Sequence, residues 1–322
     1  AWGVRRAVER MEGMFAIALW DAHERALTLI RDRLGIKPLF YQMLGGRMLF
    51  GSELKALAAH PTFDASLDTQ ALTTYLRHLY VPAPQTIYKN ARKLLPGHLL
   101  TIRDPKRALP DAEPFWSLRE VADRGHREPF QGSPEEAVDA LESLLLDSVK
   151  AHLRADVPLG AFLSAGIDSS TVVSMMQEVL PRPVRTFSVA FDAREHNEAP
   201  EAARIAKHIG TDHTELLLTG REALDVVPML PDLFDEPHAD ISQIPVYMLC
   251  ARARQQVTVA LSGDGGDEVF WGYNRYAYGP DLVSRLNVVP RSARRLLAAG
   301  IGAIPSRGWE RMHASVRPAL PK

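Results

Sequence analysis

Two short loops hold the residue types best suited to chemistry: 164–170, "SAGIDSS", and 262–268, "SGDGGDE". The first loop joins the apolar run 157–163 to the run 169–180, which we expect to be a helix that opens on serines. A strand that enters a helix through such a turn presents unpaired backbone N–H groups at the helix N-terminus, and these groups bind anions. An ordinary turn with a serine N-cap explains the same residues equally well.

Two familiar loop types do not account for residues 164–170. A Walker-type phosphate loop needs a lysine that reaches the β- and γ-phosphates, and this loop has none. A nucleophile elbow needs the pattern GxSxG, and Ser164 lacks the paired glycines. The loop is therefore a phosphate cradle of another type or an ordinary turn.

The second loop combines three glycines with three acids, Asp264, Asp267 and Glu268. Glycine lets the backbone approach a phosphate closely. The acids would repel a bare triphosphate, so their expected partner is Mg²⁺ bridging carboxylate and phosphate oxygens. A solvated acidic turn and a calcium loop are the alternatives, although the EF-hand spacing is absent. Donors in one loop and metal ligands in the other predict a nucleotide site.

Strands and helices alternate in the second half of the sequence. A helix is expected from Pro134, with Ser133 as N-cap and Glu136 at the third position. Further elements follow in the order strand 157–163, helix 169–180, strand 184–191, helix 197–210, strand 213–219, two helical stretches and strand 256–263. This alternation predicts a doubly wound, mostly parallel α/β domain. Ligands bind at the carboxyl ends of the strands in such domains, which is where both loops fall.

The first third of the sequence predicts an antiparallel sheet. Runs 13–21 and 26–32 form one expected hairpin, and runs 38–44 and 47–53 form another around Gly45-Gly46. A helix is expected over 68–80, and one more strand pair over 93–104, around Pro96-Gly97. Residues 105–133 have weak periodicity. We therefore expect a first domain over 1–115, a linker over 116–133 and a second domain over 134–322.

Composition excludes several classes of protein. The formal net charge of the 322 residues is −1, so no overall field recruits nucleic acid or an acidic membrane. No run of apolar residues is long enough to span a bilayer, and we expect a cytoplasmic protein. The single Cys250 excludes a disulfide framework and is expected to be a buried small hydrophobe, dispensable for activity. The abrupt start and end of the sequence suggest a fragment.

Four separated motifs, in order, carry a family resemblance. "SAGIDSS" resembles the SGGxDS pyrophosphate loop of N-type ATP pyrophosphatases, and "SGDGGDEVFWGY" resembles the second nucleotide-site motif of glutamine-dependent asparagine synthetases. "GMFAIALWDAHERALTLIRDRLGIKPLFY" and "FGSELKAL" resemble the distal part of that family's glutaminase domain. "DEPHADISQIPVYML", 235–249, resembles the segment before the second motif. The chain thus resembles the glutamine-hydrolysing asparagine synthetases, without the start of the glutaminase domain and the end of the synthetase domain.

The resemblance implies a fold and two coupled reactions. An N-terminal-nucleophile domain with antiparallel sheets hydrolyses glutamine, and the ammonia crosses to a synthetase domain with an ATP-pyrophosphatase-like parallel sheet. There ATP and Mg²⁺ convert aspartate to β-aspartyl-AMP, and ammonia displaces AMP. Aspartate, glutamine and ATP are then the expected substrates, with no nucleic-acid or membrane partner, and a homodimer is compatible with the resemblance.

The resemblance also implies roles for individual residues. Backbone amides around Ser164, Gly166 and Ser169 bind pyrophosphate, while Asp168, Asp267 and Glu268 face Mg²⁺. Asp264 occupies the position where many relatives carry Glu, which is associated with forming the acyl-adenylate. Four residues contact the adenosine: Phe162, Val189, Ser262 and Gly263.

Two positions depart from the family pattern. Ala165 replaces the first Gly of SGG, and a positive φ there would cost about 1 kcal/mol or more and weaken ATP binding. Trp271 stands where Gly is usual. The catalytic N-terminal Cys, the glutamine-holding Arg and Asn-Gly elements and a late Lys-bearing loop have no counterpart in these residues. A relative that amidates another carboxylate or forms a β-lactam, and a catalytically dead nucleotide-binding scaffold, are the alternative functions.

Overall fold

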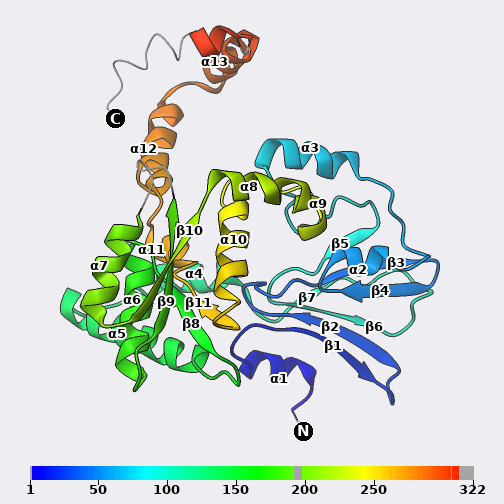
Figure 1. Cartoon of the computed structure of the whole chain (residues 1–322). Coiled ribbons are helices and arrows are strands. Elements are labelled where there is room, and N and C mark those ends of the chain that lie inside the picture. The colour runs from blue at the N-terminus through cyan, green and yellow to red at the C-terminus, as the bar shows by residue number, and fades with distance from the viewer. Residues whose placement is uncertain (1, 192–197, 306, 312–322) are drawn as a thin grey trace. The chain divides into compact units, whose positions relative to one another are not determined.

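The computed structural model describes residues 2–191, 198–305 and 307–311. The chain divides into two compact units, Ala1–Ser262 and Gly263–Lys322. The first unit contains two antiparallel sheets followed by a parallel sheet (Figure 1). The mixed α/β architecture predicted from the sequence is therefore present. Among the described residues, no helix combines the length and the apolar character needed to cross a bilayer.

The antiparallel strands form two separate sheets. The first has the order β1-β2-β6-β7 and the second β4-β3-β5. Their bounds are β1 (Ala16–Asp21), β2 (Ala26–Arg31), β3 (Phe40–Leu44), β4 (Arg47–Gly51), β5 (Ala91–Lys93), β6 (His98–Ile102) and β7 (Glu113–Pro114). The hairpin around Gly45-Gly46 is confirmed, because Leu44 pairs with Arg47 and both glycines have the positive φ that a tight two-residue turn needs.

The strand pair predicted around Pro96-Gly97 is wrong. β5 pairs with β3 in one sheet, whereas β6 pairs with β2 in the other. Gly97 has a φ of 68°, and its N–H donates to the carbonyl of Asp32 at 2.8 Å, so the chain turns onto the end of β2. The Pro-Gly turn thus moves the chain between sheets instead of folding it back on itself.

Short helices accompany these sheets: α1 (Val4–Arg10), α2 (Leu54–Ala58) and α3 (Thr69–His78). Asp68 caps α3 by accepting from Gln70 N and Ala71 N. The stretch expected as a linker contains a ten-residue helix, α4 (Leu118–Arg127), capped by Ser117. The linker residues are therefore helical in part.

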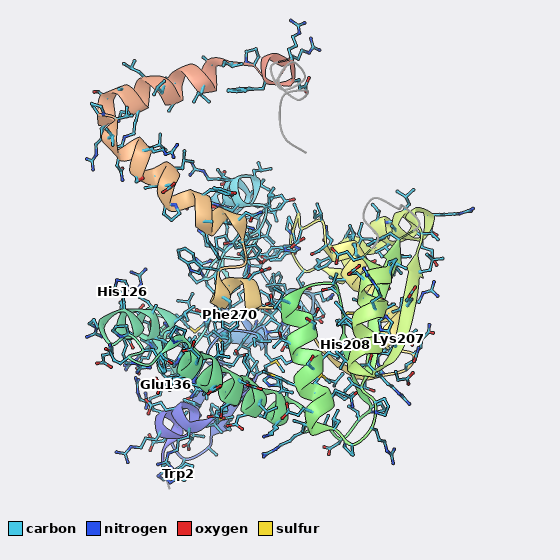
Figure 2. All side chains as sticks on the ribbon, turned by 90° about the vertical axis from the view of Figure 1, so that its left-hand side faces the viewer. Trp2, His126, Glu136, Lys207, His208 and Phe270 are labelled. Carbon is cyan, nitrogen blue, oxygen red and sulfur yellow. The ribbon has the colours of Figure 1, made fainter. Side chains whose placement is uncertain are left out.

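The predicted helix start at Ser133 is confirmed. In α5 (Pro134–His152), Ser133 Oγ accepts from Glu136 N and the Glu136 carboxylate accepts from Ser133 N, which is a complete capping box. Figure 2 labels Glu136 at this end of the helix. Two unpaired amides of the first turn are satisfied locally, so the start of α5 is set by sequence alone.

All four strands of the third sheet are parallel, in the order β10-β9-β8-β11. The elements are β8 (Leu159–Phe162), α6 (Ile167–Val179), β9 (Arg185–Phe191), α7 (Ala199–Ile209), β10 (Asp212–Leu218), α8 (Gly220–Val226), η2 (Val227–Met229), α9 (Leu230–Leu233), α10 (Gln243–Ala253) and β11 (Val259–Leu261). The helix predicted over 197–210 corresponds to α7, and its predicted first residue, Asn197, lies outside the described residues. The chain order reverses between β8 and β11, which is the topological switch point of the sheet.

Helices cover both faces of the parallel sheet, as a doubly wound domain requires. One face packs Ala161 and Leu163 against α5, α6 and α7, and the other packs Phe187 against α10. Figure 1 shows α6 and α7 on one side of the strands and α10 on the other. Cys250 is exposed on α10, so the expectation that it is buried is wrong. Met248 and Ala253 are the buried residues of that helix, and Cys250 lies two positions after Met248, which turns it away from the Met248 side.

Within its described residues, the regular elements of the second unit are helices, among them α11 (Gly266–Phe270), α12 (Asn274–Val288) and α13 (Arg291–Ala303). α11 begins immediately after Gly265, whose φ of 95° suits glycine. The acidic loop predicted to bind metal thus continues into the first turn of a short helix.

Candidate functional site

The buried side chain of Ser169 holds the loop after β8 together through hydrogen bonds. Ser169 Oγ accepts from Ser164 N at 3.1 Å and lies 2.9 Å from Ser164 Oγ. Ser164 Oγ in turn accepts from Gly166 N at 3.1 Å. The amides of Ser164 and Gly166, predicted to face pyrophosphate, are therefore occupied by serine hydroxyls, because the two side chains tie the turn together.

The helix begins earlier than the sequence suggests. α6 starts at Ile167, and no side chain caps it at Gly166. The first-turn amides of Ile167, Asp168 and Ser169 have no intrahelical partners, and the helix dipole adds positive potential there. The serine N-cap reading is therefore wrong, since Ser169 lies inside the helix. This N-terminus is chemically suited to an anion.

Ala165 carries no backbone strain. Among the described residues, the non-glycine positions with positive φ are Arg25, Leu79 and Trp271. Ala165 is not one of them, so the condition for weakened ATP binding is not met.

We therefore expect Ala165→Gly to bring no gain in affinity for magnesium-ATP. Glycine adds freedom to a loop that alanine already fits, at a cost of about 0.4–1 kcal/mol of stability. Titration calorimetry of both proteins with magnesium-ATP measures the affinities. Tighter binding by the glycine variant would show that the methyl group crowds the phosphates.

Two of the predicted adenosine contacts, Phe162 and Val189, lie on the opposite face of the sheet from α6. Phe162 packs beside Phe187 and Val257, and Val189 packs beside Met248. Both side chains are half-buried. They lie on neighbouring strands, because Phe162 of β8 pairs with Phe187 of β9.

Ser262 directly follows β11, the other neighbour of β8. Leu261 pairs with Ala161, so the two strands that lead into the loops lie side by side at the switch point. Ligands of open parallel sheets bind at such points. Both loops were predicted to follow strand ends of one sheet, and the structure adds that the two preceding strands, β8 and β11, are adjacent.

The second unit places its acids in and before the first turn of α11. Asp267 is half-buried, whereas Asp264 and Glu268 are exposed. Tyr273 donates its hydroxyl to Glu268 Oε1 at 2.7 Å, and this bond raises the pKa of Tyr273. Tyr273 could not be predicted as a partner of Glu268, since a tyrosine five residues from an acid has no distinctive pattern.

Gly272 makes room for the Asp267 carboxylate. A Cβ atom at position 272 would lie 1.8 Å from Asp267 Oδ1, a distance that no pair of unbonded atoms tolerates. Gly272 N also donates to the Asp267 carbonyl at 3.0 Å. The glycine of "FWGY" therefore leaves the space that the acid occupies, a role that was not predicted from the sequence.

Trp271 is the departure that carries a backbone cost. Its φ is 62°, in the left-handed region where Gly is favoured, and such a conformation costs about 1–2 kcal/mol for other residues. The aromatic ring lies 5.8 Å from that of Tyr276, centroid to centroid. The family pattern of Gly at this position is thus explained by the local backbone.

Among the described residues, no group of three or more His, Cys, Asp or Glu side chains is arranged to hold a metal ion. Mg²⁺ is usually held by one or two carboxylates together with substrate phosphates. The consecutive Asp267 and Glu268 suit that mode, which needs the nucleotide to complete the site.

A buried polar cluster between β9 and β10 was also missed. Thr186 Oγ1 lies 2.9 Å from His213 Nδ1 and 2.8 Å from Thr211 Oγ1, and Ser188 Oγ lies 3.1 Å from His213 Nε2. Burial lowers the pKa of His213 from 6.5, opposed by the nearby Glu215. Both ring nitrogens have partners, so this histidine has a structural role.

Stability is expected to fall on acidification because of His213. Its folded pKa lies below the unfolded value, so the unfolded chain binds the proton more readily. This stabilising contribution is fully present above the unfolded pKa of about 6.5, and it is lost as pH falls from that value through the lower folded pKa. Urea unfolding should show that the free energy of unfolding of His213→Gln changes less than that of the parent between neutral and mildly acidic pH. His208→Gln, an exposed histidine of α7 labelled in Figure 2, is the control and should keep the parent's slope.

A cavity of about 380 Å³ lies elsewhere, between α3, α9 and residues 234–238. Tyr75, Phe234, Glu236 and His238 are among the residues that line it. None of the predicted nucleotide-site residues does so.

Comparison with known proteins finds two family models in tandem. Residues 140–317 match the model described as asparagine synthase, and residues 1–116 match the glutamine amidotransferase domain. Asparagine synthetase [glutamine-hydrolyzing] 1 of Bacillus subtilis is 34% identical over 93% of this chain and 45% of its own length. A putative asparagine synthetase of Methanocaldococcus jannaschii is 33% identical over 87% of this chain and 53% of its own length.

The chain spans about half the length of the curated relatives it matches. Among solved structures, an NH3-dependent NAD synthetase from Campylobacter jejuni aligns with 42% of this chain and 60% of its own, at 12% identity and a TM-score of 0.31. A likeness at that score supports no conclusion.

Proposed function

Because this chain belongs to the asparagine synthase family, we propose that the complete protein containing it converts aspartate to asparagine with ATP and glutamine-derived ammonia. The observation that carries the proposal is the uncapped N-terminus of α6, which opens directly after β8 at the switch point of a parallel sheet. An anion-binding turn at that place suits a nucleotide substrate.

The chemistry proceeds in two displacements. An oxygen of the aspartate side-chain carboxylate attacks the α-phosphorus of ATP, and the bond to the bridging oxygen breaks, so that pyrophosphate leaves. Ammonia then attacks the activated carbonyl carbon and loses a proton, and AMP leaves with the electrons of the C–O bond. The first-turn amides of α6 would bind the departing pyrophosphate, since they offer donors and positive potential.

The site residues take the roles that the family pattern implies. Asp168, Asp267 and Glu268 would hold Mg²⁺, which when bound neutralises charge on the phosphates. Asp264 would face the acyl-adenylate. The adenosine would lie against the strand ends, at Phe162, Val189, Ser262 and Gly263.

Glutamine hydrolysis belongs, in this proposal, to the antiparallel part. We place the glutaminase domain at 1–115, the linker at 116–133 and the synthetase domain at 134–322. The matches of the two family models to 1–116 and 140–317 support this division. We propose that the reaction takes place in the cytoplasm and involves no nucleic-acid or membrane partner.

Pyrophosphate release tests the proposal in the complete protein. Aspartate with magnesium-ATP should give pyrophosphate, and asparagine should form when glutamine or ammonium is added. Release that requires a different carboxylate would overturn aspartate as the substrate and favour a relative that amidates another acid. If the complete protein did not bind magnesium-ATP, the alternative of a catalytically dead scaffold would be favoured instead.

A further inference from the structure

Two consecutive acids, Asp235 and Glu236, connect the parallel-sheet part of the first unit to its antiparallel part. They lie between α9 and α10, in the segment that covers one side of the parallel sheet. Their side chains bond to residues in the range 54–93, more than a hundred positions earlier. We refer to the pair as the carboxylate clamp.

Asp235 caps a helix that has no cap of its own. The N-cap residue of α2, Glu53, makes no side-chain capping bond. Instead, Asp235 Oδ2 accepts from Leu54 N at 2.6 Å, and Asp235 Oδ1 accepts from Lys55 N at 3.3 Å. A carboxylate at a helix N-terminus is stabilised by the unpaired amides and by the dipole. The start of α2 is therefore held by the other part of the unit.

Glu236 makes the second half of the clamp. Its carboxylate forms an ion pair with Lys93 Nζ, and Glu236 Oε2 accepts from Ile87 N at 3.2 Å. Both charged side chains are only 15% exposed. Lys93 also donates to the Val81 carbonyl, so its ammonium group is fixed from two sides.

A backbone bond extends the contact. Ala239 N donates to the carbonyl of Leu79 at 2.9 Å, at the end of α3. Residues 235–239 thus bind three separate elements of the antiparallel part: the start of α2, the strand β5 with the loop before it, and the end of α3.

The burial of the ion pair indicates what it is for. Desolvation offsets much of the attraction within a buried ion pair. Apolar side chains of similar volume in the same place often stabilise the fold just as much. Hydrogen-bonded charges do fix one relative position, because a shift leaves a buried charge unpaired. Burial raises the pKa of Glu236, while Lys93 opposes that shift, so the carboxylate depends on its partner. The clamp is therefore better suited to positioning than to stability.

We propose that Asp235 and Glu236 are positioning residues that hold the glutaminase part in register with the synthetase part, so that released ammonia is used for amidation. This inference rests on the proposed function. Loss of register would allow ammonia to escape to solvent, while each half-reaction continued by itself. The quantity that reports the clamp is thus the amount of glutamine hydrolysed for each amide formed.

Glu236→Gln in the complete protein tests the proposal, because it removes the charge and keeps the shape. We expect the ratio of glutamine hydrolysed to amide formed to rise by about threefold to thirtyfold. The rate with ammonium in place of glutamine should stay within about twofold of the parent, since the synthetase residues are untouched. The double variant Lys93→Glu with Glu236→Lys should recover part of the coupling that Lys93→Glu alone loses. Glu201→Gln, which breaks an exposed ion pair with Arg204 inside α7, is the matched control.

Hydrogen exchange at the amides of Leu54 and Ile87 gives a readout of the clamp itself. These two amides should exchange faster in Asp235→Asn and in Glu236→Gln, respectively, than in the parent. An unchanged glutamine ratio in Glu236→Gln, in a parent that does form the amide, would overturn the inference alone. A parent that forms no amide from either nitrogen source would overturn the proposed function and, with it, this inference.

Discussion

Asp267→Asn in the complete protein is expected to reduce aspartate-dependent pyrophosphate release by at least about a hundredfold, since a lost metal-facing carboxylate removes several kcal/mol of charge stabilisation. The structural reason is the position of Asp267 in the first turn of α11, beside the space that Gly272 leaves for it. Asparagine has the same shape and lacks the charge. A continuous assay of pyrophosphate measures the effect.

Asp281→Asn is the control for that experiment. Asp281 is an exposed acid of α12 that lies 3.9 Å from Arg285, and it belongs to no candidate site. It should leave pyrophosphate release at the parent's level. Glutaminase activity should also survive in Asp267→Asn, because we assign it to the other domain. Near-normal release by Asp267→Asn would show that this carboxylate does not face the metal.

Gly97→Ala is expected to destabilise the first unit by about 2–5 kcal/mol, the sum of a left-handed backbone penalty and overpacking. Gly97 has a φ of 68°, and a Cβ there would lie 2.4 Å from the carbonyl oxygen of Trp116. The same glycine accepts from Phe115 N at 2.8 Å and donates to Asp32 O at 2.8 Å. No flexible side chain can move aside, because the clash is with backbone. Thermal and urea unfolding of the chain measure the loss.

Gly125→Ala is the matched control for Gly97→Ala. Gly125 lies inside α4, and a Cβ there meets nothing within 4 Å. Alanine favours a helix over glycine by up to about 1 kcal/mol, so this variant should be neutral or slightly stabilised. A Gly97→Ala protein that unfolded with the parent would mean that the 96–98 turn can adopt another conformation.

The elements with local causes could be predicted from the sequence. The start of α5 follows from Ser133 and Glu136, whose capping box is complete within four residues. The hairpin follows from the adjacent Gly45 and Gly46, since glycine accepts the positive φ angles that the turn has. The parallel sheet follows from the alternation of strands and helices, and its strand order places both loops at neighbouring strand ends.

Features with distant partners could not be predicted. The predicted strand pair around Gly97 was wrong because β5 pairs with β3 and β6 pairs with β2, so the two strands do not pair with each other. A serine N-cap was expected, but Ser169 lies inside the helix, where its hydroxyl accepts from Ser164 N, five residues earlier, and donates to the carbonyl of Gly166. The clamp joins positions 181 residues apart, and no local pattern reports such a bond.

The distant cap on α2 has a consequence for biosynthesis. A five-residue helix is too short to be stable by itself, since isolated helices need about 12–15 residues. Its cap, Asp235, emerges from the ribosome 181 residues after Leu54. At about 5–20 residues per second, the start of α2 waits roughly 10–40 seconds for its partner. During that interval the amides of Leu54 and Lys55 lack the carboxylate that caps them in the folded chain, so α2 completes its folding only after most of the chain has been synthesised.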